Sequence, residues 1–219
     1  MIIIYPVDFT TEDKQRIENN DSFKRWVKTN SESITIDKIE IFKSFFFNEK
    51  TGFIYAKMID TEGKINGITL LRGDSVCVLI VIKTELENNY CVLVEQYRTP
   101  VGKKTTSLPA GMVEGKVVQT LIKEIKEEVS EDFDIKESEL KFLSSDYTSE
   151  GVLDEKLYTY YTEIKMKEKD IFKYQNIKSG SKEENEDITV KIVKMEELKK
   201  MDSRCRLSYY DYKEIKGIQ

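Results

Sequence analysis

Three glutamates are spaced so that their carboxylates can meet on one face of a helix. Glu124, Glu127 and Glu128 stand at i, i+3 and i+4, which is the spacing of side chains that are neighbours on a helix surface. Crowded carboxylates repel one another, and hard divalent cations such as Mg²⁺ prefer oxygen ligands of this kind. The cluster therefore predicts a magnesium site, with Mn²⁺ as the alternative ion, and such ions commonly bind substrate phosphates as well.

A glutamate-rich helix face is often only solvated, and Lys123 and Lys126 could offset the repulsion locally. Apolar residues repeat on the adjacent face and predict that this helix packs on a core: Leu121, Ile125 and Val129. The sequence at 108–112, a glycine-containing loop, feeds directly into this helix. The loop and the helix together favour the metal site over the solvated face.

The loop and helix resemble the Nudix box, G-x5-E-x7-R-E-U-x-E-E-x-G-U with U aliphatic, of the Nudix hydrolase family. Gly111 opens the box, and residues 124–128 match its E-U-x-E-E segment. Residues 108–111 resemble the sequence that precedes the box in ADP-ribose and ADP-sugar pyrophosphatases. The chain departs from the pattern in a shorter segment between Gly111 and Glu124, with Lys116 near the place of the first glutamate. Ser130 or Glu131 stands where the pattern has its second glycine. Lys123 replaces the arginine, and a lysine offers a point charge where arginine offers a bidentate fork.

Other segments resemble the same subfamily in the same order along the chain. They are residues 72–73, 94–103, 149–155 and 184–190, while residues 21–26 are similar to the front part of plant-type ADP-sugar diphosphatases. In the S-P-G-x-x-D-E loop of the subfamily, Glu150 stands in place of proline. The resemblance therefore covers nearly the whole chain.

The resemblance implies roles for individual residues. Metal ligation falls to Glu124, Glu128, the carbonyl of Ala110 and Glu186, while Glu127 is a further ligand or helps to activate water. Glu184 would be the general base. Substrate contacts fall to Arg98, which suits a diphosphate, and to four further residues: Arg72, Gly111, Asp154 and Glu155.

Each of these roles has a plainer alternative. Arg98 could form an ordinary surface salt bridge, and Asp154 and Glu155 could be turn residues that cap a strand. The acidic run at 183–187 follows residues 179–181, which the sequence indicates as a flexible point, and it could be a solvated loop tip. Trp26 is expected to anchor a core or a dimer interface.

The activity that the resemblance implies is metal-dependent hydrolysis of the pyrophosphate bond of a nucleoside diphosphate sugar, of the ADP-ribose or ADP-glucose type. One alternative is a degenerate Nudix domain that binds nucleotide sugars without turnover, as a sensor or scaffold. An RNA-cap or oligonucleotide hydrolase is disfavoured by the net charge of −5 and the isoelectric point near 5.2, because nothing in them favours a nucleic-acid partner.

The absence of histidine from the chain restricts the chemistry further. It excludes Ser-His and Cys-His nucleophile mechanisms and histidine-ligated zinc. The three cysteines, Cys77, Cys91 and Cys205, are widely spaced and predict reduced core thiols. The longest apolar run, 76–82, is too short to span a membrane, and residues 1–5 resemble no targeting peptide. A cytoplasmic protein with no membrane partner is therefore expected.

The elements that would position these residues form an α/β (α+β) chain: the resemblance implies a Nudix α/β/α sandwich with a mixed sheet. The sandwich is expected at 70–219. Its predicted strands lie at 76–82, 91–98, 140–143, 156–164 and 188–193, and a closing helix starts at 196. Residues 1–69 should hold a short helix capped at Thr11 and an antiparallel β-hairpin whose turn lies at 48–52. Many aromatics near this hairpin, Phe42, Phe45, Phe46 and Phe47, predict a homodimer.

Overall fold

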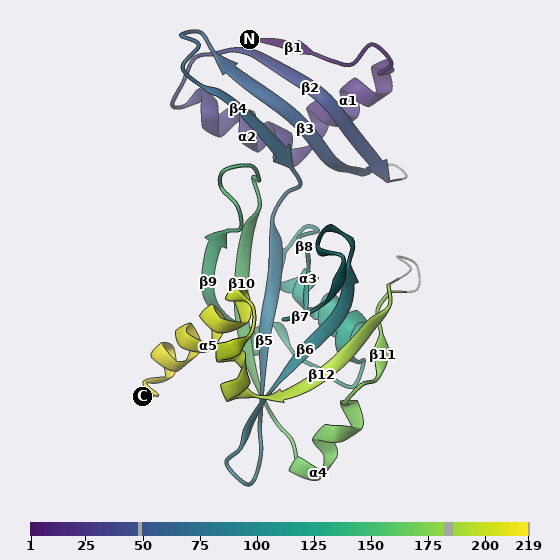
Figure 1. Ribbon diagram of the computed structural model, residues 1–219, viewed down its shortest axis with the longest axis vertical. Coiled ribbons are helices and arrows are strands. Elements are labelled where there is room, and N and C mark those ends of the chain that lie inside the picture. Colours follow the sequence, from purple (N-terminus) through teal and green to yellow (C-terminus); the bar gives the residue numbers. More distant parts are fainter. Residues whose placement is uncertain (48–49, 182–185, 219) are drawn as a thin grey trace. The chain divides into compact units, whose positions relative to one another are not determined.

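The computed structural model describes residues 1–47, 50–181 and 186–218. The chain divides into two compact units, Met1–Asp74 with Asp146–Lys156, and Ser75–Ser145 with Leu157–Gln219. Figure 1 shows the elements of each unit, coloured along the chain. The segment 146–156 returns to the first unit, where Leu153 forms a parallel bridge with Leu70. The division into a 1–69 region and a 70–219 Nudix domain stays a prediction.

The first unit begins with two helices, α1 (Thr11–Asn19) and α2 (Asp21–Ser31). The cap of α1 is Thr10, and the prediction of Thr11 was wrong. The Thr10 hydroxyl accepts the N–H of Asp13, and the Asp13 carboxylate accepts the N–H of Thr10, which satisfies two otherwise unpaired donors. Asn20 ends α1 in an extended conformation, and its side chain caps α2 by accepting the N–H of Phe23.

A four-stranded sheet of order β1-β2-β3-β4 completes the first unit. Its strands are β1 (Ile2–Ile4), β2 (Ile36–Phe47), β3 (Lys50–Asp60) and β4 (Asn66–Leu71). The predicted hairpin is confirmed by the antiparallel pairing of β2 with β3. The predicted turn at 48–52 was too long, because Lys50, Thr51 and Gly52 belong to β3, while Asn48 and Glu49 lie outside the described residues. Gly67 lies in β4, opposite Met58.

One face of this sheet packs on the two helices. Ile17 of α1 and Phe23 of α2 share a core with alternate strand residues such as Ile39 and Ala56. Among the described residues, seven large apolar side chains of the sheet are exposed: Ile2, Ile4, Phe42, Phe45, Phe47, Tyr55 and Ile68. Phe46 was expected among the exposed aromatics, but it packs against that core and contacts the ring of Phe9.

The second unit is built on an eight-stranded sheet of order β11-β12-β6-β5-β10-β9, in which β7 also pairs with β6 and β8 with β5. The sheet is mixed, because β5 is parallel to β10 and antiparallel to β6. The strands are β5 (Ser75–Lys83), β6 (Asn89–Arg98), β7 (Lys103–Ser107), β8 (Ala110–Met112), β9 (Lys141–Tyr147), β10 (Lys156–Lys165), β11 (Lys178–Ser179) and β12 (Ile188–Lys194).

Helices cover both faces of this sheet, as predicted. Val78 and Ile80 of β5 pack with Leu121 of α3 (Val117–Glu124). The alternate residue Leu79 packs with Tyr209 of α5 (Ser203–Lys216). Because successive strand residues point to opposite faces, the continuous apolar run of β5 is what a central strand covered on both sides requires. All three cysteines are free and buried, as predicted.

The remaining elements are short. They are the helix α4 (Glu168–Ile171), the 3₁₀ turns Thr99–Val101, Glu137–Glu139, Phe172–Tyr174 and Met195–Lys200, and the π-helical turn Ile125–Val129. The closing helix therefore comes in two pieces, a 3₁₀ turn and then α5, which Asp202 caps by accepting the N–H of Cys205. Across the described ranges, no helix combines the length and the apolar character needed to cross a bilayer.

Candidate functional site

The helix that carries the glutamates changes its winding in the middle of the cluster. Helix α3 ends at Glu124, and residues Ile125–Val129 continue as a π-helical turn. The N–H of Ser130 bonds to the carbonyl of Ile125, five residues back, at 3.2 Å. The sequence predicted one regular helix through residue 129, and this was wrong. Such π turns occur frequently at functional sites.

Glu128 is the buried member of the cluster, with 3% of its surface exposed. Its Oε2 accepts the backbone N–H of Ala110 at 2.8 Å. The pKa of Glu128 is raised to about 8, mainly by burial; the Ala110 N–H and the Arg98 guanidinium lower it, while the carboxylates of Glu124 and Glu186 contribute to the rise. Predicted residues from four separate segments thus lie within electrostatic reach of one carboxyl.

The carboxylate of Glu124 lies directly against the backbone of Gly111. A Cβ atom at position 111 would lie 2.2 Å from both Cδ and Oε1 of Glu124. Only glycine leaves room for this approach. Gly111 therefore fixes where the Glu124 carboxylate can lie, next to the residue that donates to Glu128.

Glu127 makes a different contact from the other two glutamates. Its carboxylate pairs with Lys123 Nζ at 3.5 Å, one helical turn away, and both side chains are partly exposed. Burial lowers the pKa of Lys123, but Glu127, Glu124 and Glu114 together raise it above the usual value. The lysine that stands in the place of the Nudix arginine thus lies among three carboxylates.

The segment after β11 is attached to the carbonyl end of the π turn. The Ser179 hydroxyl donates to the carbonyl of Glu128 at 2.6 Å, and the Gly180 N–H donates to the carbonyl of Glu127 at 2.8 Å. Gly180 has a φ of +105°, which favours glycine. The sequence treated 179–181 as a flexible point, yet these residues hold the end of the acidic loop near Glu128.

Glu186 is the described residue of that loop nearest to the cluster. Its carboxylate accepts the N–H of Ser181 at 3.2 Å, and its own N–H donates to the carbonyl of Ser181 at 3.0 Å. Glu184, the predicted general base, lies outside the described residues, as do Glu183 and Asn185. Its role stays a prediction from the sequence.

Arg98 ends β6 and is exposed, and the 3₁₀ turn Thr99–Val101 follows it. Its backbone carbonyl accepts the N–H of Gly102, which has a φ of +65°. An exposed guanidinium close enough to influence the buried Glu128 can meet an anionic group that approaches from solvent. The geometry is compatible with the predicted diphosphate contact.

The predicted substrate residues Arg72, Asp154 and Glu155 belong to the first unit, where they contact one another. The Asp154 carboxylate accepts the N–H of Arg72 at 2.7 Å, and the Arg72 guanidinium lies 3.4 Å from Glu155. Glu155 also accepts the hydroxyl of Thr148 at 2.9 Å and is buried. These contacts close the 146–156 loop.

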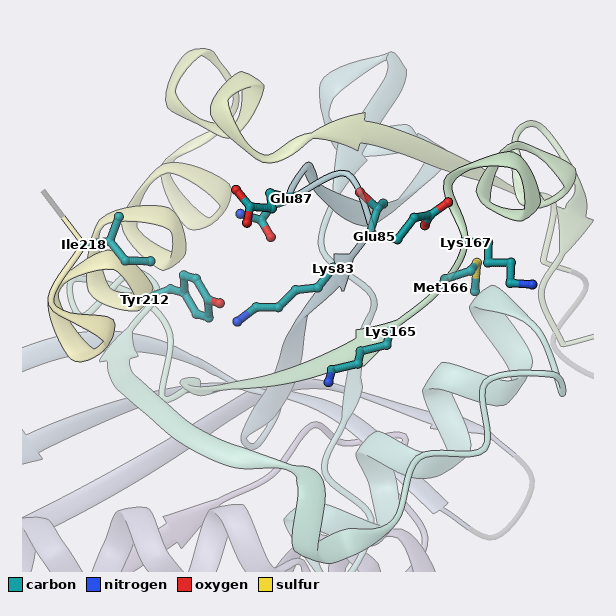
Figure 2. A pocket seen from close by; sticks show the side chains of 10 residues that line it. Lys83, Glu85, Glu87, Lys165, Met166, Lys167, Tyr212 and Ile218 are labelled. Atoms are coloured by element: carbon teal, nitrogen blue, oxygen red, sulfur yellow. The ribbon is translucent and has the colours of Figure 1, made fainter.

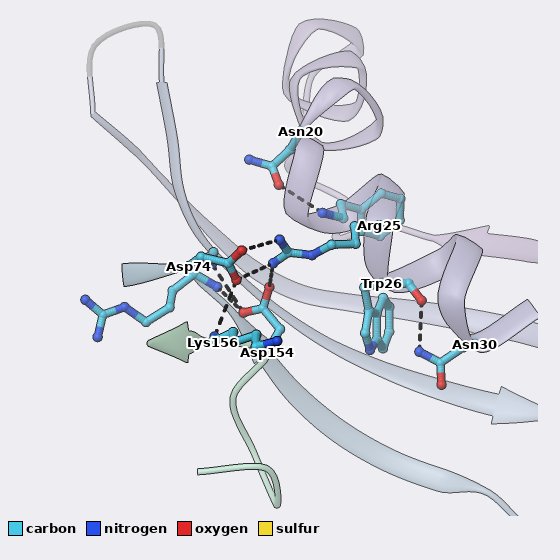
Figure 3. Close-up of polar contacts among 10 residues, drawn as sticks. Asn20, Arg25, Trp26, Asn30, Asp74, Asp154 and Lys156 are labelled. Carbon is cyan, nitrogen blue, oxygen red and sulfur yellow. Dashed lines mark hydrogen bonds and ion pairs between the residues drawn. The ribbon is translucent and has the colours of Figure 1, made fainter. Parts of the chain in front are cut away.

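Arg25 of α2 forms further ion pairs that hold the 146–156 loop in place. Figure 3 shows its guanidinium between the carboxylates of Asp74 and Asp154. The nitrogen–oxygen distances are 2.7 Å to Asp74 and 3.5 Å to Asp154. The sequence gave no reason to single out Arg25 or Asp74, because their pairing depends on residues far apart in the chain. These contacts assign the two acids of the loop at least a structural role.

A small cleft beside Glu124 was also missed. It has a volume of about 180 Å³ and is lined by Met112, Glu114, Gln119, Thr120, Lys123 and Glu124. The N–H of Glu114 donates to the hydroxyl of Thr120 at 3.1 Å, which fixes the turn between β8 and α3. Gly115, with a φ of +76°, marks that turn and was the available sequence signal.

No group of three or more His, Cys, Asp or Glu side chains is arranged to hold a metal ion in residues 1–47, 50–181 and 186–218. What this part of the chain provides is the pair of Glu124 and Glu128 at the 110–111 backbone, with Glu186 within electrostatic reach. The oxygens of these side chains are the donors that Mg²⁺ prefers.

Comparison with known proteins adds an independent observation. No protein-family model matches the chain. The chain is 28% identical over 206 residues to a protein named Nudix hydrolase 14, chloroplastic, from Arabidopsis thaliana. The alignment covers 85% of this chain, which spans 66% of the length of that relative. The chain is thus similar, across most of its length, to a Nudix hydrolase.

Proposed function

We propose that this protein is a Nudix-type hydrolase that cleaves the pyrophosphate bond of a nucleoside diphosphate sugar. One observation carries the proposal: the carboxylates of Glu124 and Glu128 meet at the backbone of Ala110 and Gly111. The similarity to a protein named Nudix hydrolase supports the reaction type. The ADP-ribose or ADP-glucose type of substrate is supported only by the resemblance of the loops around the box.

The donor set fits a divalent cation. Glu128 is buried beside the Glu124 and Glu186 carboxylates, and several carboxylates gathered in a low-dielectric site are an arrangement that a cation stabilises. Glu124, Glu128, Glu186 and the Ala110 carbonyl would hold Mg²⁺ or Mn²⁺. When bound, such an ion supplies charge neutralisation at the phosphoryl oxygens.

The chain's own residues would perform the remaining tasks. Arg98 would bind the diphosphate, because a guanidinium matches phosphate oxygens in geometry and charge. Glu184 would accept a proton from the attacking water, with Glu127 as an assisting carboxylate. The water oxygen forms a new bond to phosphorus while the bridging P–O bond breaks. The products are a nucleoside monophosphate and a sugar phosphate, and Arg72, Asp154 and Glu155 are proposed to contact the rest of the substrate.

A degenerate domain that binds nucleotide sugars without turnover is the second candidate. Lys123 in place of the box arginine favours it, because lysine holds a carboxylate less firmly than a bidentate arginine. Lys123 forms an ion pair with Glu127, which is not one of the proposed metal ligands, and this also favours the second candidate. A pure binder, however, gains nothing from crowded buried carboxylates, so hydrolysis remains the better account.

We also propose a homodimer formed through the exposed sheet face of the first unit. Phe42, Phe45 and Tyr55 are 41%, 50% and 38% exposed, and Phe42 contacts Tyr55 with ring centroids 5.2 Å apart. A contiguous apolar surface of this kind is stabilised by burial against a partner. Light scattering should give twice the chain mass, and a monomer at micromolar concentration would remove the proposal. The expected cytoplasmic location stays a prediction.

A substrate panel tests the reaction. ADP-ribose, ADP-glucose, UDP-glucose and a dinucleoside polyphosphate would each be incubated with Mg²⁺ or Mn²⁺, and nucleoside monophosphate release would be measured. We expect an ADP-sugar to be hydrolysed fastest. Binding of an ADP-sugar without any release would instead support the non-catalytic alternative.

A further inference from the structure

A second concave site lies at the other end of strand β5 from the glutamate cluster. It has a volume of about 620 Å³, within the range of ~300–1,000 Å³ that small-molecule sites occupy. Ala110 pairs with Cys77 near the start of β5, whereas Lys83 at its end lines this pocket. Six residues of extended strand separate the two places by about 20 Å. The pocket is therefore distinct from the site proposed for hydrolysis.

Three segments of the second unit converge on the pocket. The ends of the parallel strands β5 and β10 contribute Lys83 and Lys165, and α5 and the residues after it contribute Tyr212 and Ile218. The hairpin between β5 and β6 forms the rim. Figure 2 shows the Lys83 side chain extending across the pocket toward Tyr212, with Lys165 below it and Glu85 and Glu87 on the hairpin above.

Lysines outnumber acidic residues in the lining of the pocket, which holds Lys83, Lys165 and Lys167 against Glu85 and Glu87. Lys83 and Lys216 both contact the Glu163 carboxylate, at 2.9 and 2.8 Å, and Tyr212 donates its hydroxyl to the same carboxylate at 2.5 Å. Lys216 and Glu163 do not themselves line the pocket, whose lining side chains carry a formal charge of +1, three lysines against two glutamates. Within residues 1–47, 50–181 and 186–218, Lys165 takes part in no ion pair of the kind that Lys83 and Lys216 form.

The two acidic residues of the lining lie on the rim hairpin, above Lys83 and Lys165 in Figure 2. The Glu85 carboxylate accepts the N–H of Glu168 at 3.1 Å, so it is held toward α4. Glu87 lies at the exposed tip of the hairpin, where its φ is +60°. An anion would therefore be directed away from the rim and toward Lys83 and Lys165.

Apolar groups complete the lining. Met166 is half-buried and Ile218 is 48% exposed at the pocket, and the methylene stems of the lysines add further apolar surface. A ligand that uses the whole pocket would thus combine a compact dianion with an apolar body. We propose that this pocket binds a small organic phosphate monoester, with its phosphate at Lys83 and Lys165 and its apolar part against Met166 and Ile218.

Phenyl phosphate is a suitable probe, and calorimetry in the presence of EDTA keeps divalent cations out of the experiment. We expect millimolar or tighter binding by the wild-type protein. Inorganic phosphate and phenol should each bind about tenfold more weakly or worse, because inorganic phosphate lacks the apolar part of the ligand and phenol lacks the phosphate. Failure of phenyl phosphate to bind, or equal affinity for inorganic phosphate, would overturn the proposal.

Variants localise the binding. Lys165→Gln and Lys165→Glu should weaken it by about tenfold or more, and both changes are at an exposed residue. Lys169→Glu, which makes the same charge change at an exposed lysine outside the lining, should leave the affinity within about twofold. If Lys165→Glu and Lys169→Glu weakened binding equally, the loss of affinity would come from net charge alone. If Glu128→Gln abolished binding, the ligand would bind at the glutamate cluster. Either result would contradict the proposal.

Discussion

A hydrogen bond of 2.8 Å joins the backbone N–H of Ala110 to the buried carboxylate of Glu128. It links the loop before α3 to the π turn after it, and so brings together the two halves of a motif that the sequence separates. The bond also fixes one oxygen of Glu128, which leaves the other oxygen for a further partner. The neighbouring Gly111 gives Glu124 its place at the same backbone.

Gly111→Ala should damage the site more than the fold. The new Cβ would lie 2.2 Å from the Glu124 carboxylate, and the flexible end of that side chain can move away at small cost. We expect the Mg²⁺ concentration needed for half-maximal activity to rise by about tenfold or more, with little change in melting temperature.

Gly67→Ala is the matched control for this variant, because no atom lies within 4 Å of the added Cβ. It should leave the metal requirement unchanged. If Gly111→Ala had the wild-type metal requirement, the position of Glu124 would be irrelevant to metal binding.

The two glutamates of the acidic loop should have different effects. Glu184→Gln should lower turnover by about 10²-fold or more with substrate binding retained, as loss of a general base does. Glu186→Gln should instead raise the Mg²⁺ requirement, because Glu186 lies within electrostatic reach of Glu128. Steady-state kinetics at several Mg²⁺ concentrations separate the two effects, and normal values for both variants would move the search for the base to Glu127 and Glu155.

Glu163 should make stability depend on acid pH. Burial alone would raise its pKa, but the bonds from Lys216, Tyr212 and Lys83 lower it to about 2. The ionised form is thus favoured in the folded state. The contribution of Glu163 to the free energy of unfolding is fully present above its unfolded pKa of 4.5. This contribution is lost as the pH falls toward 2.

Chemical denaturation of wild type and Glu163→Gln across this pH range tests the point. The variant should be less stable by about 1–2 kcal/mol at pH 7, and the difference should shrink between pH 5 and pH 2. A difference in unfolding free energy that did not change with pH would show that the carboxylate gains no stability from its ionised form.

The sequence predicted the second unit well, because the patterns that indicate its strands and helices are local in the chain. The apolar run 76–82 predicted a central strand, because such a run is typical of a strand covered on both faces, and β5 confirms it. The glutamates of α3 and the π turn lie in the segment that their spacing indicated. The predicted cap at Thr11 was off by one residue because Thr10 and Thr11 have the same chemistry, and only Thr10 is placed three residues before Asp13.

Contacts between distant segments could not be predicted. The π turn arises from the Ser130–Ile125 bond and from packing, which no residue preference announces. Ser179 was interpreted as part of a flexible point because serine and glycine are common in loops, yet its hydroxyl is bonded to Glu128. The pairing of Arg25 with Asp74 likewise depends on tertiary structure.

We propose that the Glu124 and Glu128 carboxylates at the Ala110–Gly111 backbone serve hydrolysis. The most direct measurement is Mg²⁺-dependent release of AMP from ADP-ribose and ADP-glucose by the wild type and by Glu124→Gln and Glu128→Gln, with folding checked by circular dichroism. We expect release by the wild type and a loss of about 10²-fold or more in each folded variant. Most of the wild-type rate retained by both variants at saturating Mg²⁺ would contradict it.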